Sequence, residues 1–231
     1  MGDSLARGRP TVWVNCAVSA DGRLAYAGGR RALLSGPQDL RRVQQLRADS
    51  DAILVGVGTV ILDDPSLRVH RELLGRPAGK TPYRVILDSR GRIPPTSRVL
   101  DGSVPTIILT TDTNLRRYPT GVETIATSGS QVNLAEGLSL LLDRGIRRVL
   151  VEGGSLVLSS VLRAPLWDRL TVFVAPVLIG GSTAPTFLTG PETPDEASAT
   201  RIVRDEYVPL DDGVLLGFRP SHDRPGPRAT T

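Results

Sequence analysis

Residues 52–59, Ala-Ile-Leu-Val-Gly-Val-Gly-Thr, decide the fold of this chain, because four apolar residues run there directly into a glycine turn. A short apolar run that ends in glycine is typical of a buried strand that turns into a helix in an α/β sheet. The glycines allow a tight turn, and helix N–H groups that begin there favour a phosphate. Because Ile61 stands where the G-x-G-x-x-G pattern has its third glycine, a plain structural turn is as consistent with this stretch as a nucleotide site.

A second stretch of the same kind is Val-Glu-Gly-Gly-Ser at residues 151–155. It follows an apolar strand predicted at 148–151 and precedes a helix predicted at 156–162. Glu152 then stands at the carboxyl end of a buried strand, where open α/β sheets bind ligands. The alternative is a glutamate that only caps the helix. Two such turns in one sheet predict a ligand cleft more strongly than either turn alone.

The remaining apolar segments predict an α/β fold. Helices separate the early strands and strands follow one another late in the chain, which predicts a mixed, mostly parallel central sheet flanked by helices. Strands are expected at 11–18, 52–55, 84–87, 106–109, 148–151, 170–174, 201–208 and 214–218. We expect one domain at residues 11–219, with a flexible N-terminus at 1–10 and a disordered tail, rich in Pro, Arg and Thr, at 220–231.

Two helices carry recognisable end signals. The first begins at Pro37, and its inner face is expected to be apolar. That face carries Leu40, Val43 and Leu46, with Arg41, Arg42 and Arg47 largely off it. The second is predicted to begin at Asn133, with Glu136 returning its carboxylate to the cap, and to end at Gly145.

The composition excludes several functions. The 231 residues are 40% apolar but contain no run long enough to span a membrane, and we expect no signal peptide. The net charge is +4, yet the arginines are dispersed and not interleaved with aromatic residues, which argues against nucleic-acid binding. The lone Cys16 lies in an apolar run and is interpreted as a small core residue of a cytoplasmic protein.

Asp63, Asp64 and Pro65 follow the first glycine turn and leave two interpretations open. Adjacent carboxylates can bind a metal ion or ribose hydroxyls, or they can cap a short helix and shape the turn. The chain has two histidines, His70 and His222, and lacks the Cys/His spacing of a zinc site. We therefore expect no metal.

These segments occur together in one family. The chain resembles the riboflavin-pathway pyrimidine reductases, both the stand-alone archaeal and fungal enzymes and the reductase half of the bacterial deaminase–reductase, over residues 11–218. The motifs that carry the resemblance are SADGR at 19–23, LRA at 46–48, VGVGTV at 55–60, DDPSL at 63–67, VILDS at 85–89, VEGG at 151–154, AP at 175–176 and GG at 180–181. Each motif is short, but their order and spacing are specific.

The resemblance implies a dihydrofolate-reductase-like fold, a homodimer, and hydride transfer from NADPH to C1′ of a ribosylamino-pyrimidine 5′-phosphate in riboflavin biosynthesis. The residues that it assigns to NADPH are Ala17, Thr59, Asp63, Ser89, Arg92, Gly153, Gly154, Ser155 and Leu156. Those that it assigns to the substrate are Asn15, Ser35, Arg47, Leu67, His70 and Glu152. Asp63 and Glu152 are the candidate catalytic groups for a proton relay to the sugar oxygen, and the choice between them stays open.

Two positions bear on the choice of pyrimidine. Asn15 stands where the bacterial enzymes carry lysine, and His70 stands where they carry arginine. Both residues are similar to the archaeal type, which favours the 2,5-diamino-6-ribosylamino-4(3H)-pyrimidinone phosphate over the deaminated aminouracil phosphate. The alternatives are a dihydrofolate-reductase-like enzyme of another pathway and, outside the enzymes, a silent nucleotide-binding module.

Overall fold

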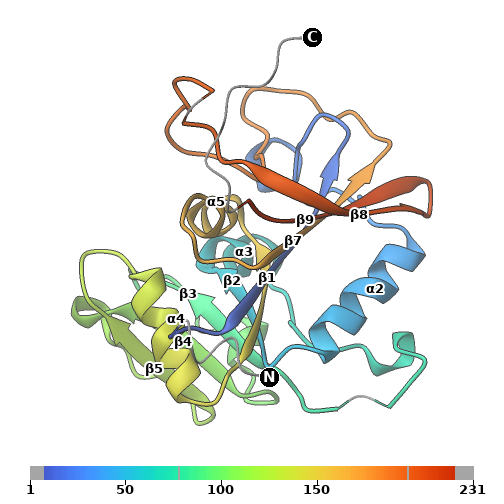
Figure 1. Cartoon of the computed structure of the whole chain (residues 1–231). Helices are drawn as coiled ribbons and strands as arrows, with labels where there is room; N and C mark the ends of the chain where they lie inside the picture. Colours follow the sequence, from blue (N-terminus) through green and yellow to red (C-terminus); the bar gives the residue numbers. More distant parts are fainter. Residues whose placement is uncertain (1–7, 78, 197, 222–231) are drawn as a thin grey trace.

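A single sheet runs through the centre of the molecule (Figure 1). The computed structural model describes residues 8–77, 79–196 and 198–221. The strands of these residues are β1 (Thr11–Ser19), β2 (Ala52–Gly56), β3 (Tyr83–Leu87), β4 (Thr106–Thr111), β5 (Val122–Thr127), β6 (Arg148–Gly153), β7 (Arg169–Ala175), β8 (Ile202–Leu210) and β9 (Gly213–Pro220). They lie in the order β5-β4-β3-β2-β6-β1-β7-β9-β8.

The sheet is mixed and mostly parallel. Each neighbouring pair from β5 to β7 is parallel, whereas β9 runs antiparallel to both β7 and β8. This arrangement confirms the fold class expected from the sequence. The strand that was not predicted is β5, in which only Ile125 and Thr127 are buried. Its sequence, Val-Glu-Thr-Ile-Ala-Thr, lacks the continuous apolar run that marks a central strand.

Helices cover both faces of this sheet. They are α2 (Pro37–Ala48), α3 (Val57–Asp63), α4 (Leu134–Asp143) and α5 (Ser155–Arg163), with 3₁₀ turns η1 (Ala27–Gly29), η2 (Arg71–Leu73), η3 (Arg98–Leu100) and η4 (Asp112–Asn114). Val14 and Val151 of the central strands share an apolar cluster with Leu138 of α4 and with α5. Side chains alternate along a strand, so Asn15 and Glu152 point to the opposite face, where α2 meets them. In the described part of the chain, none of these helices has the length and apolar character to cross a membrane.

The faces of α2 are oriented differently from the prediction. Asp39 and Gln44 are buried, while Leu40 is 44% exposed. Arg42 and Arg47, expected off the inner face, extend inward and bind carboxylates. Apolar residues alone do not mark the inner face of α2, because ion pairs lie on that face. The predicted face was therefore wrong for Leu40, Arg42 and Arg47, whereas Val43 and Leu46 are partly buried.

Helix α4 begins as predicted but lacks the returning carboxylate. Asn133 Oδ1 accepts a hydrogen bond from the Glu136 N–H at 3.2 Å, and Gly145, with φ of +79°, follows the end of the helix. The Glu136 carboxylate instead accepts hydrogen bonds from the N–H and hydroxyl of Ser128. Because the Asn133 N–H already donates to the Thr127 hydroxyl, it does not need the carboxylate.

Both ends of the described chain contact the sheet. Arg9 donates two hydrogen bonds to Asp168, at 2.7 and 3.0 Å, within the segment expected to be a flexible N-terminus. Strand β9 extends to Pro220, the first residue of the expected tail. The remainder of those two predicted segments, residues 1–7 and 222–231, lies outside the described residues.

Cys16 lies in the core. Its side chain is 5% exposed, and burial raises the pKa of the thiol to about 12, against an opposing effect of the Arg42 charge. A thiol with so high a pKa stays protonated at neutral pH and is a poor nucleophile. Cys16 is therefore a small core residue, as predicted.

Candidate active site

Four parallel central strands bring polar residues and glycines together at their carboxyl ends. The strands are neighbours in the order β3-β2-β6-β1 and run in the same direction. Toward their carboxyl ends lie Asn15 on β1, Gly56 on β2 and Glu152 on β6, and Ser89 follows β3. Ligands of open α/β sheets bind at this end of the strands.

The two glycine turns are in contact there. A Cβ added to Gly154 would lie 3.1 Å from the hydroxyl oxygen of Thr59. One added to Gly56 would lie 2.7 Å from a methyl group of Val157 in α5. The turns that the sequence predicted in one cleft therefore lie against each other, and their close approach requires glycine.

The start of α5 presents backbone donors at this contact. Gly153 and Gly154 have φ of +137° and +45°, conformations that other residues rarely adopt. Gly154 is the N-cap and has no side chain to satisfy the first N–H groups of the helix, which are therefore available to an anion. The Ser155 hydroxyl donates to the Thr186 carbonyl, and the Leu156 side chain is 77% exposed. The backbone of the turn, more than these side chains, supplies the donors.

Arg47 and Glu152 form a bidentate ion pair between α2 and β6. The Nε and Nη2 of Arg47 donate to the two carboxylate oxygens at 2.7 Å each. The side chains are only 16% and 10% exposed. Burial alone would lower the pKa of the guanidinium, but the charge and hydrogen bonds of Glu152 outweigh it and raise that pKa. Glu152 therefore binds Arg47, which removes the alternative that it only caps α5.

A second arginine of α2 fixes the amide of Asn15. Arg42 Nη2 and the Thr171 hydroxyl both donate to Asn15 Oδ1 at 2.8 Å. Asp39 in turn holds Arg42, whose Nε and Nη2 donate to one carboxylate oxygen. Because a guanidinium has only donors, the amide oxygen faces Arg42 and the amide Nδ2 is left to meet a ligand. Asp39, Arg42 and Thr171 were not predicted, although the i,i+3 spacing of the first two was an available signal.

The two adjacent aspartates have different surroundings. Asp63 ends α3 with an exposed carboxyl, and partial desolvation raises its pKa against the opposing charge of Arg31. Asp64 follows in a left-handed conformation, with φ of +39°, and accepts the Arg98 N–H at 2.8 Å. The turn-shaping interpretation therefore applies to Asp64, whereas Asp63 remains exposed at the end of α3.

Leu67 and His70 lie a few residues further on the same segment. Leu67 is 3% exposed and has φ of +48°. The His70 N–H donates to Gln44 Oε1 of α2, which ties the segment to that helix. The imidazole of His70 is half exposed, with Nδ1 3.0 Å from a carboxylate oxygen of Glu72. Backbone contacts thus place this segment beside the helix that carries Arg47.

Four predicted residues lie at the margins of this cluster. The Ser89 hydroxyl accepts the Val132 N–H at 2.9 Å, and Arg92 is exposed. Ala17 lies on β1 and Ser35 precedes α2, both partly buried. Within the described ranges, no hydrogen bond or ion pair joins these four residues to the glycine turns.

The arrangement suits a phosphate-bearing cofactor beside a polar organic molecule. The N–H groups at the start of α5, which have no side-chain cap and lie beside Thr59, are donors of the kind that bind a phosphate. Asn15, Arg47 and Glu152 offer donors and a carboxylate next to it. As far as the structure describes the chain, no group of three or more His, Cys, Asp or Glu side chains is placed to hold a metal ion.

Comparison with known proteins identifies the family. Residues 10–216 match the family described as RibD C-terminal domain. The chain belongs to this reductase family. Like this chain, a RibD structure from Acinetobacter baumannii has the mostly parallel α/β fold, with a TM-score of 0.81 at 30% identity over 94% of this chain and 60% of that one.

Archaeal relatives of the RibD C-terminal domain are similar in length to this chain. It is 38% identical over 214 residues to the 2,5-diamino-6-ribosylamino-4(3H)-pyrimidinone 5′-phosphate reductase of Methanothermobacter thermautotrophicus, covering 91% of this chain and 98% of that protein. The enzyme of the same name from Archaeoglobus fulgidus is 36% identical over 191 residues, 79% of this chain and 87% of that protein. The predicted membership of the riboflavin-pathway reductases is confirmed.

Proposed function

We propose that the chain is a cytoplasmic reductase of riboflavin biosynthesis, which uses NADPH to convert the ribosyl group of 2,5-diamino-6-ribosylamino-4(3H)-pyrimidinone 5′-phosphate to ribityl. The observation that carries this proposal is the Arg47–Glu152 pair, whose glutamate lies on β6, the strand that leads into a glycine turn with uncapped helix N–H groups. The names of the two archaeal relatives support the choice of substrate.

The glycine turn at 153–155 is the proposed site for the pyrophosphate of NADPH. Thr59 lies beside it, and Ser89 and Arg92 are assigned to the adenosine 2′-phosphate on the same edge of the sheet. When bound, NADPH supplies the hydride that reduces C1′. The residues of this chain hold the two reactants in line, and such positioning supplies much of the rate.

The reaction also takes up one proton, and the two candidate carboxylates differ in their freedom to supply it. Glu152 is engaged at both oxygens by Arg47, so we assign it to orientation of the substrate and to stabilisation of positive charge at the reacting carbon. Asp63 is exposed, and its raised pKa makes it a better proton carrier than an ordinary aspartate. We therefore assign the proton relay to Asp63.

NADPH oxidation by the purified protein tests the function with three compounds in parallel. A kcat/KM for the diamino-pyrimidinone phosphate at least tenfold above that for the deaminated aminouracil phosphate supports the proposal. A reversed preference would move the function to the aminouracil compound. Turnover of dihydrofolate alone, or NADPH binding with no turnover, would refute the proposal in favour of another pathway or a silent nucleotide-binding module.

Asp63→Asn should lower kcat about 100-fold, the lower end of what a general acid contributes, because water can partly replace an exposed group. The amide keeps the shape of the side chain but cannot deliver the proton. Thermal stability should change little, and any loss of NADPH affinity from this cofactor contact should be smaller than the loss of kcat. Steady-state kinetics against pH provide the measurement, with Asp143→Asn at the exposed end of α4 as the matched control. Equal kcat values for Asp63→Asn and the wild type would remove Asp63 from the relay.

We also propose that two copies of the chain form a homodimer. β8 is an edge strand of the sheet, and its Ile202, Tyr207 and Val208 side chains are 41%, 60% and 37% exposed. An exposed strand edge with apolar side chains favours association with another chain. Size-exclusion chromatography with light scattering should give twice the mass of one chain, and a monomer at micromolar concentration would contradict the proposal.

A further inference from the structure

The turn at residues 98–103, called the platform below, is built on a fully buried arginine. Arg84 of β3 is 0% exposed, and its Nη1 donates to the Val99 carbonyl at 3.2 Å and to Asp101 Oδ1 at 2.8 Å. The same oxygen of Asp101 accepts the N–H and the hydroxyl of Ser103, at 3.0 and 2.6 Å. Backbone and side chain of the platform are thus fixed to one buried guanidinium.

Burying a charged arginine costs desolvation free energy, so its position in the core calls for an explanation. Burying an ion pair adds little net stability, because the desolvation of two charges offsets their attraction. Burial would also raise the pKa of Asp101, but hydrogen bonds from Arg84 and Ser103 hold it well below its usual range. The carboxylate is therefore charged at any physiological pH. What the pair does provide is a fixed geometry.

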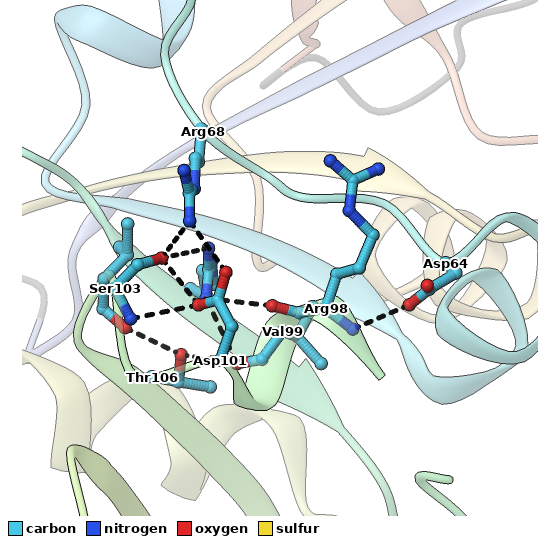
Figure 2. Close-up of polar contacts among 9 residues, drawn as sticks. Asp64, Arg68, Arg98, Val99, Asp101, Ser103 and Thr106 are labelled. Atoms are coloured by element: carbon cyan, nitrogen blue, oxygen red, sulfur yellow. Dashed lines mark hydrogen bonds and ion pairs between the residues drawn. The ribbon is translucent and has the colours of Figure 1, made fainter. Parts of the chain in front are cut away.

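The platform contacts both ends of residues 63–70, called the site loop below. At one end, Asp64 Oδ1 accepts the Arg98 N–H at 2.8 Å. At the other, Arg68 Nη2 donates to Asp101 Oδ2 at 2.7 Å and to the Ser103 hydroxyl. Figure 2 shows both contacts, with Arg68 directed onto Asp101 and Ser103 and Asp64 beside Arg98.

The site loop leads directly to the candidate active site. It carries Asp63 and His70, and Leu67 within it has φ of +48°, a conformation that persists in such a residue only where the surroundings impose it. The carbonyl of Arg68 accepts Arg47 Nη1 at 3.0 Å. The guanidinium of Arg47 is therefore held on one side by Glu152 and on the other by the backbone of the site loop.

We propose that the platform positions the site loop, and that Arg68 is a positioning residue whose clamp on Asp101 and Ser103 sets Arg47 against Glu152. Arg68 acts through its own carbonyl and so has no need to touch substrate or cofactor. The side chain of Arg68 is 47% exposed, and an ion pair this exposed contributes little to the stability of the fold. Its role is therefore to place the site loop. This inference rests on the proposed function for its kinetic consequence, but its structural part can be measured separately.

Arg68→Met keeps the apolar stem of the side chain and removes the clamp. We expect a five- to tenfold rise in KM for the pyrimidine phosphate, with kcat lowered less than threefold and KM for NADPH unchanged. Arg68→Lys keeps the charge on a shorter side chain that reaches Asp101 and Ser103 less well, and it should recover part of the loss. The matched control is Arg144→Met, which breaks a similarly exposed pair with Glu123 on the outer strand β5. Equal KM values for Arg68→Met and wild type, or equal rises in Arg144→Met, would overturn the proposal.

A second measurement does not depend on turnover. The NMR signal of the Arg47 Nε–H is identified by its loss in Arg47→Lys. In the wild type this proton should exchange slowly with water, because Glu152 and the Arg68 carbonyl hold the guanidinium from two sides. In Arg68→Met this exchange should be at least fivefold faster, and in Arg144→Met it should be unchanged. If the wild type reduces no pyrimidine phosphate, the proposed function fails while this readout still tests the platform. Unchanged exchange in Arg68→Met would refute the positioning role even in an active enzyme.

Discussion

Glu152→Gln is expected to lower kcat/KM for the pyrimidine phosphate about 1,000-fold, near the upper end of what one preorganised electrostatic contact contributes. The glutamine amide offers the Arg47 guanidinium one acceptor oxygen and one NH₂ group. The NH₂ group is a donor and cannot pair with the N–H donors of the guanidinium. Arg47 keeps its hydrogen bond to the Arg68 carbonyl and one bond to the amide oxygen, but the bidentate pair is lost. Positive charge at the reacting carbon then has no fixed carboxylate facing it. Steady-state kinetics give the effect, and the melting temperature shows that the fold is kept.

The control for this change is Glu123→Gln. Glu123 accepts Nε and Nη2 of Arg144 at 2.9 and 2.7 Å, a similar contact on the exposed outer strand β5. Its kcat/KM should equal that of the wild type. NADPH affinity should be the same in both variants, because the glycine turn is untouched. An unchanged kcat/KM in Glu152→Gln would remove this residue from the reaction and leave it a structural partner of Arg47.

The sequence predicts most of the sheet because its central strands contain continuous apolar runs. Residues 52–55 and 149–151 lie between other strands and are buried on both faces, so their composition alone marks them. Strand β5 escapes this criterion because it lies at an edge and is half exposed. The apolar composition also fails to mark the inner face of helix α2, for a different reason. Its inner face is buried but polar, and Asp39 and Gln44 can be placed inside only once their partners are known.

The same limit applies to the candidate site. The resemblance assigned Arg47 and Glu152 to the substrate, but residues 105 positions apart could not be paired before the fold was known. Arg84 carried a usable signal, since a charged residue in an otherwise apolar strand is almost never buried without a partner. That partner, Asp101, comes from a turn without a motif of its own. What the sequence lacks is therefore the layer of contacts that holds the recognised residues in place.

Gly154→Val is expected to raise the Kd for NADPH at least 300-fold. Gly154 has φ of +45°, which a β-branched residue rarely adopts, and an added Cβ would crowd the Thr59 hydroxyl at 3.1 Å on the turn assigned to the pyrophosphate. Either the turn opens and its N–H groups lose their direction, or the methyl groups occupy the anion site. Both outcomes remove the interaction between the helix N-terminus and the phosphates. Titration of the purified protein with NADPH, followed by fluorescence or calorimetry, measures the loss.

Backbone strain alone must be separated from this local effect, and Gly145 provides the comparison. It also has a positive φ, +79°, but no atom lies within 4 Å of its added Cβ, and it follows α4 at the far end of the strand that leads to Gly154. Gly145→Val therefore carries a similar conformational penalty and should lower the melting temperature while leaving NADPH affinity unchanged. If Gly154→Val binds NADPH as tightly as the wild type does, the pyrophosphate lies elsewhere. If both variants lose affinity equally, the loss reports general destabilisation and the glycine turn has no special role.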